Sequence, residues 1–261
     1  MKPHNVSALL VGFFVAAAMS RYGFAQAPGA SAPVKTVNIA VAANFTEPAK
    51  EIAALFKQKT GQDAILSFGS SGQFYTQITQ DAPFQIMLSA DDERPKKLIS
   101  DSLGVAGSAF TYAIGKLVLW SKTADFVKGE ATLKAGAFSK ISIANPAAAP
   151  YGAAAIEAMK ALNVYETLKP KIVQGGSIAQ AFQFIDTGNA ELGFIALSQL
   201  AGNNAGSRWI VSQSLYSRIA QDAVLLKKGA ANEAATGFLT FLKGPEARAV
   251  IEKFGYEIAK N

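Results

Sequence analysis

The chain has 261 residues, of which 50% are hydrophobic and 17% are charged, and it contains no cysteine. This composition is typical of a compact soluble protein, and the lack of cysteine excludes disulfide bonds, thiolate metal sites and a cysteine nucleophile. The formal net charge is +6, yet the lysines and arginines are scattered along the chain and form no run typical of nucleic-acid binding.

The first 27 residues have the pattern of a secretory signal peptide. Lys2 supplies a basic start, residues 6–18 form an apolar segment, and residues 25–27 read Ala-Gln-Ala, an A-x-A cleavage site. The apolar segment is shorter than the roughly 20 residues that a membrane-spanning helix needs, which argues against an anchor. We therefore expect residues 1–27 to be removed, residues 28–35 to form a linker, and the mature protein to be periplasmic.

Cleavage would leave a mature chain without histidine. The removed segment contains the single histidine, His4, and two of the 25 basic residues, so that 23 basic residues remain against 19 acidic ones, a formal charge of +4. A Ser-His-Asp or Cys-His catalytic set and a histidine-ligated zinc or iron site are then excluded. We expect a protein that is not an enzyme and has no cofactor, with a small positive excess that helps to attract an anion.

From Thr36 onward, short β-rich runs alternate with helical patterns, which is typical of an α/β protein with parallel strands. The expected strands are 37–41, 64–68, 85–89, 141–144, 171–174, 192–195 and 223–226, and the expected helices are 48–60, 73–80, 95–100, 153–162, 178–187, 232–242 and 245–254. The extended run 109–121 is long for one strand and contains Gly115, so we expect it to cross between two lobes. One lobe should contain residues 36–112 and 221–261, and the other residues 113–220.

Hydroxyl, amide and glycine residues gather in the turns that lead from strands into helices. Four such turns are 42–46 (Ala-Ala-Asn-Phe-Thr), 69–72 (Gly-Ser-Ser-Gly), 145–152 (from Asn-Pro to Tyr-Gly) and 175–178 (Gly-Gly-Ser-Ile). Open α/β sheets bind ligands beyond the carboxyl ends of their strands. A helix N-terminus there presents unpaired N–H groups and about half a positive charge. The four turns together predict a cup of neutral donors for a small, doubly negative anion.

A cup made only of donors would also select among anions. Each hydrogen bond to a charged group contributes roughly 1.5–3 kcal/mol, so about six could offset desolvation and still allow tight binding. Donors cannot satisfy the remaining proton of hydrogen phosphate, so a fully deprotonated oxyanion should be preferred. Serine, threonine and asparagine are also ordinary helix caps, so no single turn decides the matter. Glu47 would repel an anion if it pointed inward, and we expect it to complement its own helix dipole from outside.

At these residues the sequence resembles the periplasmic molybdate-binding proteins of ABC importers, from about residue 37 to residue 258. The segments that carry the resemblance are 42–46 (AANFT), 68–71 (FGSS), 86–91 (IMLSAD), 192–194 (LGF) and 242–247 (LKGPEA). The resemblance implies an α/β protein with the two-lobed, type II periplasmic-binding-protein fold, in which each lobe is a mixed sheet flanked by helices and two crossing strands join the lobes. It also implies capture of molybdate or tungstate between the lobes and delivery to the membrane permease of an ABC importer. We expect a monomer without a nucleic-acid partner.

The resemblance further implies which residues bind the oxyanion. Ala43 and Asn44 match the first binding loop and Ser71 matches the serine of the second. Tyr151 falls in the third loop, and Ile178 falls where an aliphatic residue donates its backbone N–H. The metal of molybdate or tungstate would be held through its oxygens by these same residues.

Two departures from the family pattern leave alternatives open. Some members place a ligand tyrosine just after the Leu-Gly strand, where this chain has Ala196, and the phenol of Tyr151 is a candidate replacement from the opposite loop. Asn44 stands where other members have serine, so its donor is either the side chain or the backbone. These residues do not indicate whether molybdate or tungstate is preferred.

Three other functions fit parts of the pattern. A carrier for sulfate or phosphate would use a similar cup, because the turns define charge and shape better than size. A ferric-ion carrier would need anionic and tyrosine ligands, which the neutral turns match poorly. A secreted hydrolase with Ser71 as nucleophile is a third possibility, but residues 69–72 are not a G-x-S-x-G elbow, the mature chain has no histidine base, and no S-x-x-K begins at Ser70 or Ser71.

Overall fold

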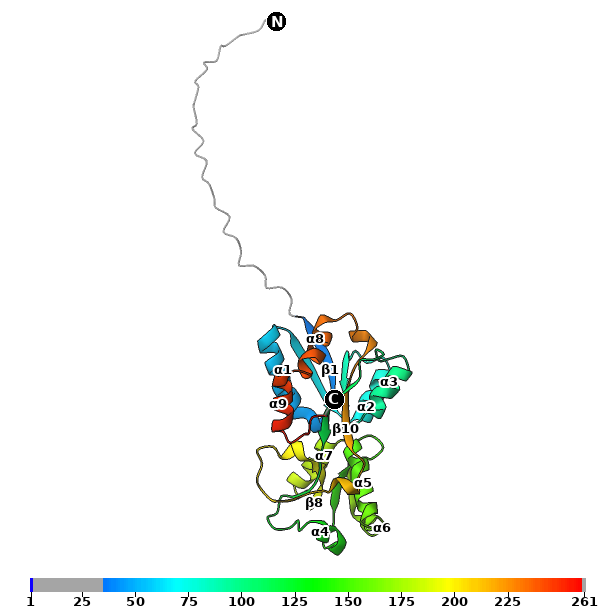
Figure 1. The fold of residues 1–261 in the computed structure, drawn as a ribbon, viewed down its shortest axis with the longest axis vertical. Coiled ribbons are helices and arrows are strands. Elements are labelled where there is room, and N and C mark those ends of the chain that lie inside the picture. The colour runs from blue at the N-terminus through cyan, green and yellow to red at the C-terminus, as the bar shows by residue number, and fades with distance from the viewer. Residues whose placement is uncertain (2–34, 260–261) are drawn as a thin grey trace, which may run out of the picture. The chain divides into compact units, whose positions relative to one another are not determined.

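The structure is a computed structural model that describes Met1 and residues 35–259. The predicted signal peptide, apart from Met1, and the predicted linker, apart from Lys35, lie outside the described residues. Val34–Asn261 forms one compact unit, in which the elements of Figure 1 are arranged. Within the described part of the chain, every helix is too short or too polar to span a membrane.

Two five-stranded sheets organise this unit. The first consists, in spatial order, of β2 (Asp63–Gly69), β1 (Thr36–Ala42), β3 (Ile86–Leu88), β10 (Ile219–Leu225) and β4 (Phe110–Gly115). The second consists of β7 (Ile172–Gly175), β6 (Ile141–Ala144), β8 (Leu192–Ala196), β5 (Leu117–Ser121) and β9 (Ser207–Ile210). In each sheet the first three strands are parallel, and β10 or β5 pairs antiparallel with both of its neighbours. These mixed sheets confirm the predicted fold class, and we call the parts built on them lobe one and lobe two.

Helices cover both faces of the first sheet because its strands are apolar on both sides. Successive strand residues point to opposite faces: Ile39 of β1 packs in the core with one group of helices, and Ala40 packs with another. The first group is α1 (Thr46–Thr60), α8 (Glu233–Leu242) and α9 (Pro245–Lys253), and the second is α2 (Ser71–Thr79) and α3 (Glu93–Ser100). Figure 1 shows α1 and α9 on one side of this sheet and α2 and α3 on the other.

In lobe two, helices likewise cover both faces of the sheet. Leu119 of β5 packs with α5 (Pro150–Ala161), whereas Trp120 faces the opposite side and stacks on Phe182 of α7 (Ile178–Asp186). Each lobe therefore has a hydrophobic core of its own, and the polar residues between the lobes are free to form a site.

The chain crosses between the lobes in two places. β4 ends at Gly115 in the first sheet and β5 begins at Leu117 in the second, so the predicted extended run 109–121 is two strands in different sheets. The chain returns between β9 and β10, which rejoins the first sheet at Ile219. The first sheet therefore ends at Gly115 and resumes at Ile219, whereas we expected lobe one to end at residue 112 and to resume at residue 221. The sheet is longer at both crossings because β4 and β10 remain paired there.

All the strands and helices expected from the sequence are present, with ends shifted by a few residues. Three short elements were not expected: α4 (Glu130–Ala135), α6 (Tyr165–Leu168) and β9. The two helices are too short to show a hydrophobic period, and β9 is a partly exposed strand that exists because it pairs with β5. The starts of α2 and α5 also lie earlier than predicted, at Ser71 and Pro150, which places two predicted site residues in first helical turns.

Gly115 allows the crossing strand to pass close to lobe two. A Cβ at this position would lie 2.1 Å from the Tyr151 hydroxyl and 2.7 Å from Gln221 Nε2. We expect Gly115→Ala to lower the free energy of unfolding by about 1–3 kcal/mol, as measured by urea denaturation. The matched control is Gly237→Ala, at a half-buried position of helix α8 where the nearest atom is a flexible side-chain oxygen at 3.2 Å. This control should raise the stability by up to about 1 kcal/mol, and two equal effects would contradict the expectation.

Candidate ligand-binding site

A small pocket lies where the two lobes meet. Its cavity volume is about 10 Å³, and it is lined by Ala42, Ala43, Asn44, Gly69, Ser70, Ser71, Ala90, Ala149, Pro150, Tyr151 and Ile178. All five residues predicted to bind the oxyanion are in this set, and none of these lining residues carries a charged side chain. The structure therefore brings the predicted residues together around one neutral pocket.

Strand register explains why the four turns converge. Ala42 at the end of β1 is paired with Gly69 at the end of β2, so the first two turns start side by side. In lobe two, Ala144 at the end of β6 is paired with Gly175 at the end of β7, which aligns the other two turns in the same way. The pocket thus lies beyond the carboxyl ends of parallel strands from both sheets, as expected for open α/β sheets.

Backbone N–H groups at three helix starts are available to a ligand. Ser71 and Ile178 are the first residues of α2 and α7, and Tyr151 is the second residue of α5. Such N–H groups have no partner within their own helix, and among the described residues none of these three donates to a protein acceptor. The pocket therefore receives unpaired donors from both lobes.

The caps of α2 and α7 leave these first N–H groups free. Ser70 Oγ accepts from Gln73 N at 3.4 Å, and Ser177 Oγ accepts from Gln180 N at 3.3 Å. Each capping serine therefore satisfies a donor one turn into the helix and not the donor at its first residue. Ser70 and Ser177 act as structural caps, and the residue after each contributes the unpaired N–H group, although Ser70 also lines the pocket.

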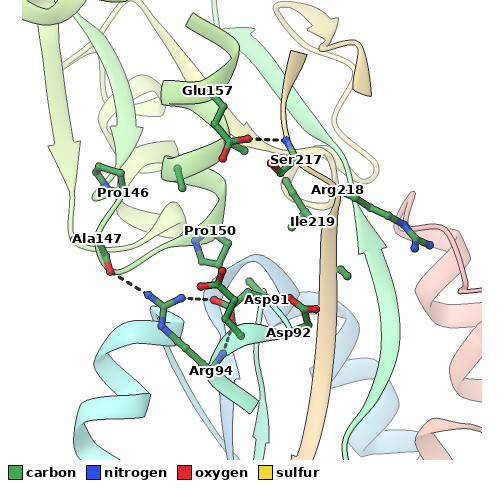
Figure 2. A pocket seen from close by; sticks show the side chains of 15 residues that line it. Asp91, Asp92, Arg94, Pro146, Ala147, Pro150, Glu157, Ser217, Arg218 and Ile219 are labelled. Carbon is green, nitrogen blue, oxygen red and sulfur yellow. Dashed lines mark hydrogen bonds and ion pairs between the residues drawn. The ribbon is translucent and has the colours of Figure 1, made fainter. Parts of the chain in front are cut away.

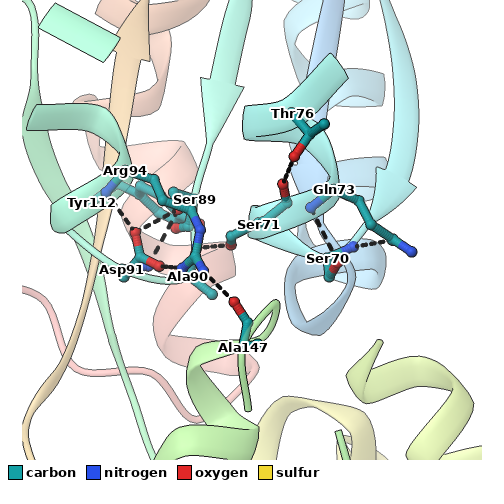
Figure 3. A network of polar contacts seen from close by, with 11 residues as sticks. Ser70, Ser71, Gln73, Thr76, Ser89, Ala90, Asp91, Arg94, Tyr112 and Ala147 are labelled. Carbon is teal, nitrogen blue, oxygen red and sulfur yellow. Dashed lines mark hydrogen bonds and ion pairs between the residues drawn. The ribbon is translucent and has the colours of Figure 1, made fainter. Parts of the chain in front are cut away.

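The hydroxyl of Ser71 adds a further donor. Its side chain is 1% exposed, and Ser71 Oγ accepts a hydrogen bond of 2.9 Å from the backbone N–H of Ala90 (Figure 3). A hydroxyl has one proton to donate besides its acceptor sites. Because an N–H group already occupies an acceptor position, the proton of Ser71 is left to point at an acceptor in the pocket.

The side chain of Asn44 is turned away from this role. Its amide Nδ2 donates to Gln221 Oε1 at 2.8 Å and to the Tyr256 hydroxyl at 2.9 Å. Both amide hydrogens are thus used within lobe one. Asn44 belongs to the short 3₁₀ helix η1 (Ala43–Phe45), which has no side-chain cap, so its backbone N–H is the donor it can still offer.

The phenol of Tyr151 accepts one hydrogen bond from the protein and keeps its own proton to donate. Its oxygen accepts from Gln221 Nε2 at 3.1 Å, and the side chain is 1% exposed. Burial raises the pKa of Tyr151 well above its ordinary value, so this phenol is neutral. Ala196, which occupies the position of a ligand tyrosine in some family members, is buried and does not line the pocket.

A closed ring of hydrogen bonds joins the two lobes beside Asn44. The Tyr256 hydroxyl accepts from Asn44 Nδ2 and lies 2.9 Å from Ser198 Oγ, and Ser198 Oγ in turn donates to the Asn44 carbonyl at 2.8 Å. Ser198 belongs to lobe two and the other two residues to lobe one. Buried networks of this kind hold their members in one arrangement when every donor has an acceptor.

Gln221 extends this ring to Tyr151, so the whole network consists of Asn44, Tyr151, Ser198, Gln221 and Tyr256. The sequence analysis identified only Asn44 and Tyr151 among them. Gln221 carried a usable signal, because a fully buried glutamine in an apolar strand needs hydrogen-bond partners. Tyr256 and Ser198 carried none, since only the fold brings them beside Asn44.

Glu47 does not approach the pocket. It is exposed and forms an ion pair of 2.7 Å with Lys50 in the first turns of α1. Glu47 therefore does not point inward at the pocket, which has no carboxylate among its lining residues.

Comparison with known proteins identifies the family of this chain. The family model described as "Bacterial extracellular solute-binding protein" matches residues 37–257. The chain belongs to this family. This solute-binding protein is 58% identical over 217 residues to the molybdate-binding protein ModA of Rhodobacter capsulatus, covering 83% of this chain and 86% of that protein. It is 52% identical over 230 residues to the molybdate-binding protein ModA of Azotobacter vinelandii, covering 87% and 91%.

A solved structure shows the same fold. The periplasmic molybdate-binding protein of Azotobacter vinelandii superimposes on this solute-binding protein with a TM-score of 0.83 at 36% identity, covering 86% of this chain and 100% of that chain. The two-lobed, type II periplasmic-binding-protein fold expected from the sequence is therefore confirmed.

The ring through Tyr256 should stabilise the folded protein. Tyr256→Phe removes the hydroxyl and leaves an Asn44 N–H and the Ser198 hydroxyl short of a buried partner. We expect a loss of about 1–3 kcal/mol in the free energy of unfolding, measured by urea denaturation. Tyr165→Phe, at a half-buried tyrosine with no hydrogen bond among the described residues, should change it by less than about 0.5 kcal/mol. Equal stabilities for the two variants would show that the ring contributes nothing.

Proposed function

We propose that this chain is a periplasmic solute-binding protein that captures molybdate or tungstate between its lobes and delivers it to the membrane permease of an ABC importer. The observation that carries the proposal is the convergence of unpaired N–H groups from both lobes on a pocket without charged lining residues. The molybdate-binding relatives at 52% and 58% identity support the choice of ligand. The proposal includes a cleaved signal peptide at residues 1–27 and a monomeric mature protein.

Six neutral donors form the binding site in this proposal. Five are the backbone N–H groups of Ala43, Asn44, Ser71, Tyr151 and Ile178, and the sixth is the hydroxyl of Ser71. The engagement of both Asn44 amide hydrogens favours the backbone at this position, whereas the Tyr151 phenol, which accepts from Gln221 Nε2, keeps its proton as a further candidate donor. At roughly 1.5–3 kcal/mol for each hydrogen bond to a charged group, six such donors can replace the hydration of a small dianion.

The chemistry of this donor set favours binding over catalysis. The polar partner of Ser71 Oγ is the Ala90 N–H group, which cannot accept a proton and so cannot serve as a general base. The one titratable side chain that lines the pocket is Tyr151, whose pKa is raised by burial. A serine hydrolase would need a base at this position.

Titration calorimetry with molybdate, tungstate, sulfate and phosphate tests the proposed ligand. We expect molybdate and tungstate to bind tightly and phosphate to bind most weakly at neutral pH, because hydrogen phosphate retains a proton that a set of donors cannot accept. Preferential binding of sulfate or phosphate would replace the proposed ligand with another oxyanion. Heat from none of the four anions would contradict an oxyanion site altogether.

Ser71→Ala tests the donor role of the hydroxyl. We expect molybdate binding to weaken by about 1–3 kcal/mol, or roughly 5- to 150-fold in Kd, as measured by calorimetry. The matched control is Ser177→Ala, because Ser177 caps α7 and does not line the pocket, so the change should affect stability by about 1 kcal/mol and affinity much less. An unchanged affinity in Ser71→Ala would remove the hydroxyl from the site.

A further inference from the structure

Lobe one holds two neighbouring carbonyl groups of one loop of lobe two. Arg94 Nη2 donates to the Ala147 carbonyl at 3.0 Å, and the Gly72 N–H donates to the Ala148 carbonyl at 2.9 Å. A Cβ on Gly72 would lie 2.9 Å from Ala148 Cα, so glycine permits this approach. The residues that follow in the loop, Ala149 to Tyr151, line the pocket. These two hydrogen bonds therefore hold the lobe-two wall of the pocket against lobe one.

Asp91 sets the direction of the Arg94 guanidinium. Its carboxylate pairs with Arg94 Nη1 and accepts from Arg94 N at 3.0 Å (Figure 2). It also accepts from Ser89 Oγ at 3.0 Å (Figure 3). The side chains of Arg94 and Asp91 are 21% and 14% exposed. Because the guanidinium is planar, binding one nitrogen to a fixed carboxylate aims the other nitrogen, here at Ala147.

The same loop of lobe one is attached to the pocket. Ala90, which precedes Asp91, lines the pocket and donates its N–H to Ser71 Oγ (Figure 3). Arg94 itself does not line the pocket but lies in a larger groove beside it. Any effect of Arg94 on a bound anion is therefore exerted through the position of the Ala147 loop.

We propose that Arg94, aimed by Asp91, is a positioning residue that clasps lobe two in the closed protein and slows release of the bound oxyanion. The proposal rests on the function proposed above. Separation of the lobes must break the Arg94 to Ala147 hydrogen bond, so the bond stabilises the closed state relative to the open one. Its effect should appear mainly in the dissociation rate.

A simpler role for Arg94 would be to attract the anion by its charge, and two substitutions separate these roles. Asp91→Asn removes a negative charge next to the site and the charged partner of the guanidinium. Attraction alone predicts tighter binding. The clasp predicts faster release, because the guanidinium is no longer held in its orientation. Arg94→Lys keeps the charge but cannot bind Asp91 and Ala147 with two nitrogens of one planar group. Attraction alone predicts no change, whereas the clasp predicts faster release. We expect molybdate dissociation to accelerate on the order of tenfold in each variant, as measured by stopped flow.

The matched control is Lys97→Ala, which removes a positive charge from α3 where the lysine pairs with Asp101 within lobe one. Its dissociation rate should equal that of the unsubstituted protein, and urea denaturation of all three variants shows whether each is folded. Wild-type rates in both Asp91→Asn and Arg94→Lys, or tighter binding in Asp91→Asn, would overturn the clasp.

A ligand-free measurement separates failure of the clasp from failure of the proposed function. Because the chain has no cysteine, Lys57→Cys and Lys128→Cys allow one fluorophore on each lobe. Energy transfer should report a smaller closed fraction in Asp91→Asn and Arg94→Lys than in the same labelled protein without them. If the protein binds none of the four anions, the oxyanion function fails, and this closed fraction alone decides the clasp. An unchanged closed fraction in both variants would refute the clasp.

Discussion

The pocket between the lobes depends on backbone N–H groups that, among the described residues, have no protein acceptor. Ser71, Tyr151 and Ile178 present such groups at the first turns of three helices, at a pocket that closes between the lobes. A buried donor that has lost its water and gained no partner costs about 1–3 kcal/mol. A ligand that brings several acceptors to one point removes that cost at every donor at once, which is why a compact oxyanion suits this pocket.

The neutrality of the pocket has a second consequence. A lysine or arginine in the site would attract many anions, including protonated ones, whereas helix starts and a hydroxyl offer partial charges in fixed directions. Fixed directions require that the donors do not relax when the site is empty. The buried ring through Asn44, Tyr256 and Ser198 supplies this rigidity, because it holds the first turn by its side chain and its carbonyl together.

The two sheets share one arrangement, and this explains why a site forms between them. In both, parallel strands end at the pocket, and the paired ends of β1 with β2 and of β6 with β7 align successive turns. The crossing at Gly115 and the return to β10 connect the lobes by short segments. In the proposed clasp, rotation of the lobes about these segments breaks the interlobe contacts, and the hydrogen bond from Arg94 to Ala147 favours the closed state.

Much of the molecule was already determined by local patterns in the sequence. The alternation of strands and helices, the α/β class and the donor-rich turns follow from hydrophobic periodicity and capping chemistry, and family motifs within those turns indicated Ala43, Asn44, Ser71, Tyr151 and Ile178. Only the tertiary structure decided which atoms face the pocket. Both hydrogens of the Asn44 amide are donated to Gln221 and Tyr256, and the Tyr151 phenol accepts from Gln221, so each of these pairings joins residues about 70 to 210 positions apart in the chain. No local pattern encodes such pairings, because a hydrogen bond between distant residues depends on how the sheets and lobes pack and not on the neighbours of either residue.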